Sequence, residues 1–247
     1  MFVRRVVVCV VVLLAVFAVL TFALAAPKAE KPGNPNPGVV PLTAKVAGMD
    51  YGQWSVRYAQ WLWLRPLHAD LLGDPTAGQD PKSPVLFLPT WRGSGPFNGA
   101  ITIPPGKMLL VPMTFFTGFF VPYMGCCGSS AGEQIQTLDD FSMHAPGCLA
   151  AWVDSTMEDP HATVDGRPVC DPQQYRATSQ GVYLAEFPVD SILAGLPCGI
   201  ENTSVWALSD GYWLFLKPLS VGNHLLSFGT SAGEAVLQVT VAPEKKK

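Results

Sequence analysis

The pattern Gly-x-Ser-x-Gly occurs twice in the chain, at residues 128–132 and 229–233. In α/β-hydrolases this pattern forms a sharp turn between a strand and a helix, and the turn exposes a nucleophilic serine. The first copy follows the apolar stretch FFVPYMG and precedes EQIQTLDDF, which has a helix-like composition. Ser130 is therefore the candidate nucleophile of a serine hydrolase.

A nucleophilic serine needs a histidine base and an acid that orients it. Asp190 or Asp210, followed by His224, supplies both in the chain order of that hydrolase fold. The alternating strands and helices of the fold are missing from the sequence, however, and the second copy of the motif leads straight into a strand. Ser231 is therefore expected in an ordinary turn. The first prediction is a non-catalytic protein, and a secreted serine hydrolase using Ser130 is the alternative.

The remaining histidines, His68, His144 and His161, lie in segments whose composition is typical of loops. His144 and Cys148 are near each other, but no spacing among these residues is typical of a zinc site. We therefore expect surface histidines, no metal and no cofactor. His224 opens a predicted strand and is expected to face outward.

Five cysteines lie outside the N-terminal apolar run: Cys126, Cys127, Cys148, Cys170 and Cys198. In an exported chain they are expected to form structural disulfides. The open pairings are Cys170 with Cys198, and either Cys126 or Cys127 with Cys148. Because five is odd, one thiol stays free or bonds another chain.

Exposed tryptophans can stack on sugar rings, and Trp91 is the best candidate because it lies in the loop-like segment TWRGSGPFNG. The other tryptophans outside the predicted helix are expected in the core or at its rim. A glycan or an envelope protein is therefore the expected partner. With a net charge of −3 and no basic patch, the chain is not expected to bind nucleic acid.

Residues 50–66, DYGQWSVRYAQWLWLRP, carry signals for both the start and the end of a helix. Asp50 is a good N-cap with Gln53 three residues on, and Pro66 cannot continue the helix. Its aromatic residues fall on one face at helical spacing, so a sheet is expected to cover them.

Short apolar runs separated by Gly and Pro turns fill most of the remaining sequence, and residues 133–157 are partly helix-like. Asp165-Gly166 predicts a hairpin. Residues 212–241 are interpreted as a three-strand meander, and Pro104-Pro105-Gly106 as a tight reversal between strands. The predicted fold is mainly β: an antiparallel β-sandwich, jelly-roll-like or Ig-like, with an N-terminal amphipathic aromatic helix and a short central helical insert.

The N-terminus predicts export. Arg4 and Arg5 precede an apolar run, and Ala23-Leu24-Ala25 fits a small-x-small cleavage site. Residues 1–25 are interpreted as a signal peptide or an uncleaved membrane anchor, which would be the only membrane contact. Residues 26–47 are expected to be a Pro-rich linker, residues 48–243 the β-sandwich domain, and residues 244–247 a basic tail. The expected location is the periplasm, the cell surface or the medium.

Four stretches of the chain resemble a family of uncharacterised exported bacterial proteins: YGQWSVRYAQWLW, IPPGKMLLVPM, the hairpin text of residues 163–169, and SDGYWLFLKPLSVGNHLLSFG. The resemblance covers roughly residues 50–241. It implies an exported protein of similar fold. It implies no catalytic residues, because the family has no established activity.

Overall fold

A computed structural model describes residues 36, 38–66, 74, 76–90, 97–120, 137–191 and 203–244, all within the unit Asn36–Lys247. In these residues two sheets of five strands each are accompanied by two α-helices and one short 3-10 helix. The prediction of a mainly β fold with an aromatic helix and a central helical insert is confirmed. Buried side chains of both sheets belong to one hydrophobic cluster.

The aromatic helix forms as the sequence predicts, as α2 (Tyr51–Trp63). The carboxylate of Asp50 accepts the amide N–H of Gln53, and the Gln53 side chain accepts the amide N–H of Asp50. This capping box satisfies donors that the first helical turn leaves unpaired. The buried face is almost continuous, and it includes Tyr51, Trp54, Tyr58, Trp61 and Leu62.

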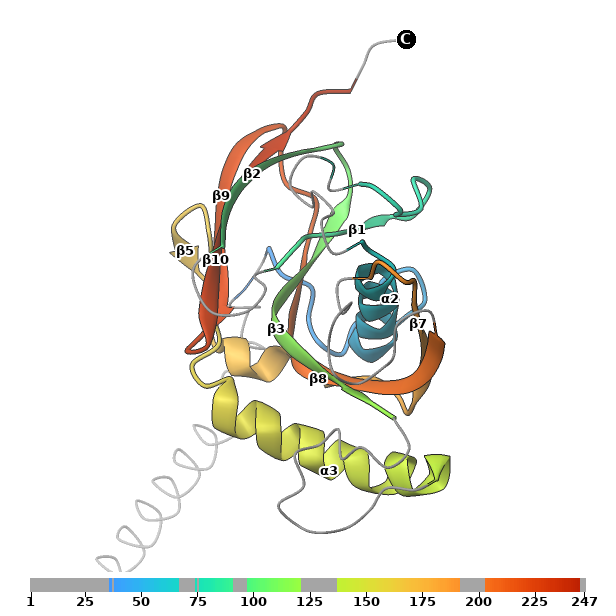
Figure 1. Ribbon diagram of the computed structural model, residues 1–247. Helices are drawn as coiled ribbons and strands as arrows, with labels where there is room; N and C mark the ends of the chain where they lie inside the picture. Colours follow the sequence, from blue (N-terminus) through green and yellow to red (C-terminus); the bar gives the residue numbers. More distant parts are fainter. Residues whose placement is uncertain are drawn as a thin grey trace, which may run out of the picture. The chain divides into compact units, whose positions relative to one another are not determined.

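The first sheet covers this aromatic face. Its strand order is β1-β3-β8-β6, and β7 also pairs with β8; the strands are β1 (Val85–Phe87), β3 (Met108–Phe119), β6 (Arg176–Thr178), β7 (Tyr183–Phe187) and β8 (Thr203–Leu216). Figure 1 shows α2 beside β7 and β8. The Tyr58 ring lies 5.4–5.5 Å from the rings of Phe87, Phe115 and Trp213, each in a T-shaped contact. Such pairs add about 0.5–1.5 kcal/mol each beyond simple burial.

The polar tips of Tyr51, Trp54 and Tyr58 on α2 reach main-chain groups. The Tyr51 hydroxyl donates to the carbonyl of Val40 over 2.5 Å and accepts the amide N–H of Phe215. The Trp54 indole donates to the carbonyl of Val46, and the Tyr58 hydroxyl donates to that of Leu88. The helix is therefore fixed to the rest of the core by hydrogen bonds as well as by burial.

The second sheet has the order β2-β10-β9-β4-β5, with β2 (Phe97–Ile103), β4 (His161–Val164), β5 (Arg167–Pro168), β9 (Gly222–Thr230) and β10 (Gly233–Val241). The expectation of purely antiparallel strands is wrong at two places, because β1 pairs with β3 and β2 with β10 in parallel. The predicted hairpin of β4 and β5 is confirmed. Asp165 and Gly166 have φ values of 52° and 74°, as a type I′ turn requires.

The predicted three-strand meander is wrong. β9 and β10 form a hairpin, but β8 belongs to the first sheet. The turn at Pro104-Pro105-Gly106 likewise connects β2 of the second sheet to β3 of the first. The sequence predicts a turn between adjacent strands at Pro104-Pro105-Gly106 and between β8 and β9. In the structure, each of these connections links a strand of one sheet to a strand of the other.

The central helical insert is α3 (Leu138–Thr156), which lies along β3 and β8 on the side away from α2 (Figure 1). Thr137 and Asp140 form its capping box. Its buried residues recur every four positions: Phe141, Ala145, Leu149 and Val153. Phe141, Ala145 and Leu149 form a separate small cluster with Leu208 of β8. A narrow apolar stripe thus holds a long helix.

The folded region begins earlier than the predicted boundary at residue 48. Val39, Val40 and Val46 are buried, and the amide of Val40 donates to the carbonyl of Phe215 over 2.8 Å. The side chain of Asn36 donates to the carbonyl of Cys170 and accepts its amide N–H. Four residues of the expected linker, Asn36, Val39, Val40 and Val46, are therefore buried in the folded unit. The proline content predicted a linker outside the core. The contacts with the core come instead from three valines and one asparagine in the same segment.

The predicted leader, residues 1–25, and the last residues of the basic tail lie outside the described residues. Within the described part of the chain, no helix is long and apolar enough to cross a bilayer.

Tyr51→Phe tests the hydrogen bonds that tie α2 to the chain on either side of it. The change leaves a buried carbonyl and a buried amide without their partner, so we expect the free energy of unfolding to fall by about 1–3 kcal/mol. Denaturant unfolding measures it. Tyr212→Phe is the matched control, because the structure shows no hydrogen bond of that hydroxyl within the described residues. Equal losses in the two variants would contradict the assignment.

Candidate functional site

Several residues named from the sequence lie outside the described residues: Ser130, Trp91, Cys126, Cys127 and Cys198. Their roles stay predictions. Cys148 on α3 and Cys170 after β5 are exposed free thiols. Since each was expected to pair with a cysteine outside the described part, the disulfide predictions also stay open.

His224 has a different environment from the one predicted. Its Nδ1 lies 2.8 Å from a carboxylate oxygen of Asp165, and its Nε2 lies 2.9 Å from the carbonyl oxygen of Ser220. Its partner is therefore Asp165, not Asp190 or Asp210. The expected outward orientation is also wrong: the side chain is 10% exposed, and its strand position pairs with Val239, on the buried face.

The arrangement of Asp165, His224 and Ser220 superficially resembles a catalytic triad, because the Ser220 hydroxyl lies 3.3 Å from Nε2. Each ring nitrogen, however, has a nearer oxygen that only accepts hydrogen bonds, at 2.8 Å for Nδ1 and 2.9 Å for Nε2. Burial lowers the pKa of His224, but the hydrogen bonds to Asp165 and to the Ser220 carbonyl outweigh it and raise that pKa above its ordinary value. When the imidazole is protonated, it donates from both nitrogens as a structural clamp and has no lone pair for a base.

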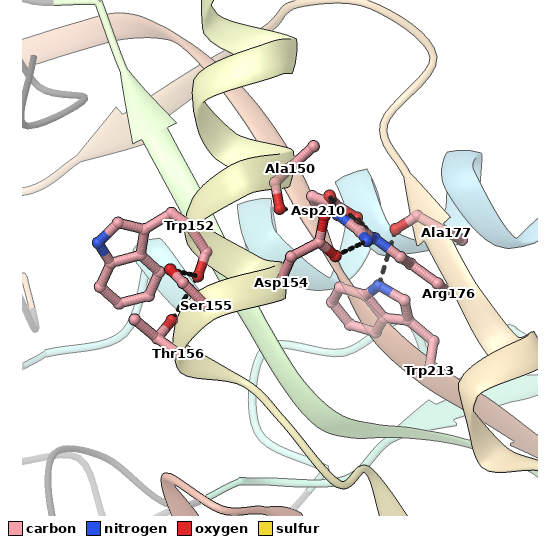
Figure 2. A network of polar contacts seen from close by, with 9 residues as sticks. All are labelled: Ala150, Trp152, Asp154, Ser155, Thr156, Arg176, Ala177, Asp210 and Trp213. Atoms are coloured by element: carbon pink, nitrogen blue, oxygen red, sulfur yellow. Dashed lines mark hydrogen bonds and ion pairs between the residues drawn. The ribbon is translucent and has the colours of Figure 1, made fainter.

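Asp210, the other acid considered for a triad, is buried at 1% exposure beneath α3. Arg176 pairs with it through Nε, 3.1 Å and 3.2 Å from its two oxygens, and through a second nitrogen at 2.5 Å (Figure 2). The same guanidinium donates to Asp154 and to the carbonyl of Ala150, both on α3. These contacts account for the charge on Asp210 and tie α3 to the sheet.

A groove of about 400 Å³ lies between α2 and the segment that leads into β1. The outer face of α2 contributes Arg57 and Gln60, together with parts of Trp54 and Trp61. Residues 78–85 form the opposite wall, and Met49 and Phe87 add apolar surface. This volume lies within the range of about 300–1,000 Å³ that is typical of small-molecule sites.

Hydrogen bonds hold the walls of the groove in place. The indole of Trp61 and a guanidinium nitrogen of Arg65 both donate to the carbonyl of Ala77. The Gln79 side chain accepts the amide N–H of Phe87 and donates to its carbonyl. Lys107 donates to the carbonyls of Pro81 and Ser83. A site with walls fixed in this way pays little ordering entropy when it binds a ligand.

Two cations border the groove, Arg57 on α2 and Lys82 on the opposite wall. Both are exposed, and neither side chain makes a hydrogen bond or ion pair with another described residue. Among the described residues that line the groove, Asp80 is the one acidic residue. The groove is therefore locally positive on a chain with a net charge of −3.

The sequence predicts the aromatic face of α2 in the core and Gln53, Arg57 and Gln60 on the opposite face by helical spacing. No binding role was assigned to that opposite face, although two of its residues line the groove. Nothing local in the segment 76–84 indicates that it folds back onto the helix. No group of three or more histidine, cysteine or acidic side chains in the described residues is arranged to hold a metal.

Comparisons with known proteins give no family. No family model matches the chain, and no curated protein does. Among solved structures the chain is similar to one titled "Structure of PbICP-C in complex with falcipain-2", at 10% identity over 64% of this chain and 98% of that chain, with a TM-score of 0.22. Such a TM-score supports no conclusion about fold or function. The resemblance of residues 50–241 to exported bacterial proteins stays an expectation.

The His224 clamp predicts a pH dependence of stability. Because the pKa of His224 is raised in the folded chain, its contribution is fully present below the unfolded value of about 6.5 and is lost as the pH rises through the folded value. Denaturant unfolding across a pH series measures this loss, and Asp165→Asn should lower the histidine pKa observed by NMR. His224→Gln should remove this part of the pH dependence. An unchanged pH profile in that variant would refute the clamp.

Arg176→Leu tests the ion pair beneath α3. Removing the guanidinium leaves a buried carboxylate without its counter-charge, which costs about 3–5 kcal/mol. Asp154→Asn is the control: that carboxylate is 61% exposed, and an exposed pair contributes about 0–1 kcal/mol. Thermal or denaturant unfolding compares the two variants. A small loss for Arg176→Leu would show that Asp210 does not depend on it.

Proposed function

We propose that the chain is an exported, non-catalytic binding protein of the cell envelope or extracellular space, and that its ligand occupies the groove between α2 and residues 78–85. The carrying observation is the groove itself: a hollow of about 400 Å³ bordered by Arg57 and Lys82, two cations without partners among the described residues. Binding sites combine apolar lining with a few polar groups that orient the ligand.

The expected export supports this proposal. Arg4 and Arg5, the apolar run behind them and the small-x-small sequence at residues 23–25 are typical of a secretory signal. A protein carried out of the cytosol meets glycans and envelope proteins, which are the partners expected from the sequence.

The alternative, a secreted serine hydrolase using Ser130, has less support. Its expected base, His224, has both ring nitrogens engaged, by Asp165 and by the Ser220 carbonyl, and Asp210 is engaged by Arg176. Replacing Ser130 with Ala and assaying ester and amide turnover tests this alternative directly. A rate that disappears with this replacement would overturn the non-catalytic proposal.

Pro84→Trp tests the groove as the binding site. Pro84 is exposed on the groove wall, so an indole there fills the hollow without changing its charge. A glycan array and a pull-down from envelope extract first identify what the mature chain binds. We expect Pro84→Trp to weaken that binding at least tenfold, as measured by calorimetry.

The matched control is Pro168→Trp, since Pro168 is an exposed proline on β5 of the other sheet. It should bind as the wild type does, and both variants should keep the wild-type melting temperature within a few degrees. Trp91→Ala, examined alongside, tests the loop tryptophan named from the sequence. Full binding by Pro84→Trp would overturn the groove assignment.

A further inference from the structure

We infer that the ligand of this groove is an acidic saccharide, a chain of sugar rings that bear carboxylates. The inference rests on the proposed function, and it names the chemistry that the groove is built to recognise. Three observations carry it: two cations without partners among the described residues, a carboxylate on the groove that can accept from hydroxyl groups, and a neighbouring strand edge that is closed to peptides.

The cations set the charge of the ligand. Arg57 extends from the exposed face of α2 and Lys82 from the turn before β1, so the two positive charges stand on opposite walls of the groove. Hydrogen bonds from a guanidinium or an ammonium group to a carboxylate are about twice as strong as neutral ones. Charges on two walls suit a ligand whose negative charges are spaced along its length.

Asp80 favours a ligand that also has hydroxyl groups. One of its carboxylate oxygens accepts the amide N–H of Lys82 over 2.8 Å, and its side chain is exposed on the groove. An ionised carboxylate only accepts hydrogen bonds, so it repels a purely anionic ligand and needs donors. Sugar hydroxyls are such donors, and a sugar acid combines them with a carboxylate in one ring.

The two tryptophans of the groove, Trp54 and Trp61, are too buried for a sugar ring to stack on them. Trp54 and Trp61 are only 4% and 6% exposed, and both indole N–H groups point to main-chain carbonyls of the protein. Recognition in this groove therefore depends on its charged and hydrogen-bonding groups. This favours a polar, charged saccharide over a neutral one that binds chiefly by ring stacking.

The edge of β1 disfavours a peptide. A peptide commonly binds by adding a strand to a free sheet edge. Here the amide and carbonyl of Phe87 are both bonded to the Gln79 side chain, and the amide of Val85 donates to the Ser83 hydroxyl. β3 occupies the other edge of β1. The main-chain groups that an added strand needs are already in use.

Calorimetry with the mature chain tests the inference. The probes are oligomers of galacturonate, guluronate and hyaluronan, the fully methyl-esterified galacturonate oligomer of equal length, and an oligoglutamate peptide. We expect at least one acidic sugar to bind and to weaken as salt rises, since exposed charges are screened. The neutral ester should bind at least tenfold more weakly, and the peptide should not bind.

Arg57→Gln and Lys82→Gln should each weaken the acidic sugar about tenfold, because each removes a charge-assisted hydrogen bond. Arg167→Gln, a change of the same kind on β5, should have no effect. If Pro84→Trp abolishes binding of a neutral sugar or of the peptide while Arg57→Gln and Lys82→Gln do not, the groove stands and the acidic saccharide is wrong. If no acidic sugar binds to folded wild-type chain, the inference also fails.

Discussion

The fold depends on burying the phenol and indole side chains of α2 while Tyr51, Trp54, Tyr58 and Trp61 each find a hydrogen-bond partner for their polar tips. An unsatisfied buried donor or acceptor costs about 1–3 kcal/mol, and four such residues lie on one helical face. Tyr51, Trp54 and Tyr58 solve this by reaching carbonyls of Val40, Val46 and Leu88. The chain on both sides of the helix must therefore lie against it, which explains why the residues before Asp50 belong to the core.

The same constraint creates the groove. Once one face of α2 is committed to the sheet, helical geometry leaves Arg57 and Gln60 on the opposite side. Trp61 then needs an acceptor for its indole, and the carbonyl of Ala77 supplies it. That bond draws the segment 76–84 against the helix and forms the second wall. Binding chemistry on the outer face and packing on the inner face thus have a common origin in one amphipathic helix.

Local patterns predicted local structure well, and long-range pairing poorly. The capping box at Asp50 and the turn at Asp165-Gly166 depend on neighbouring residues, so both could be read from the sequence. Whether β8 pairs with β9 or with β3 depends on contacts between distant segments, and its apolar run fits either sheet. The burial of Val39 could not be predicted from its proline-rich surroundings either, because its partner, Leu216, is distant in the sequence. The groove was missed because its second wall is a turn-rich loop without periodicity.

The pairing of Arg176 and Asp210 fixes the position of α3 more closely than apolar burial can. The helix buries one narrow stripe with a repeat of four residues, and that repeat does not by itself fix where along the sheet the helix lies. The guanidinium removes that freedom, because it must meet Asp210 on β8 while it donates to Ala150 and Asp154 on α3. A shift of α3 by one turn, about 5.4 Å, would break the hydrogen bonds from Arg176 to Ala150 and Asp154, while the guanidinium stays paired with the buried carboxylate of Asp210. A buried charge that adds little net stability therefore gives this face of the sheet a single arrangement.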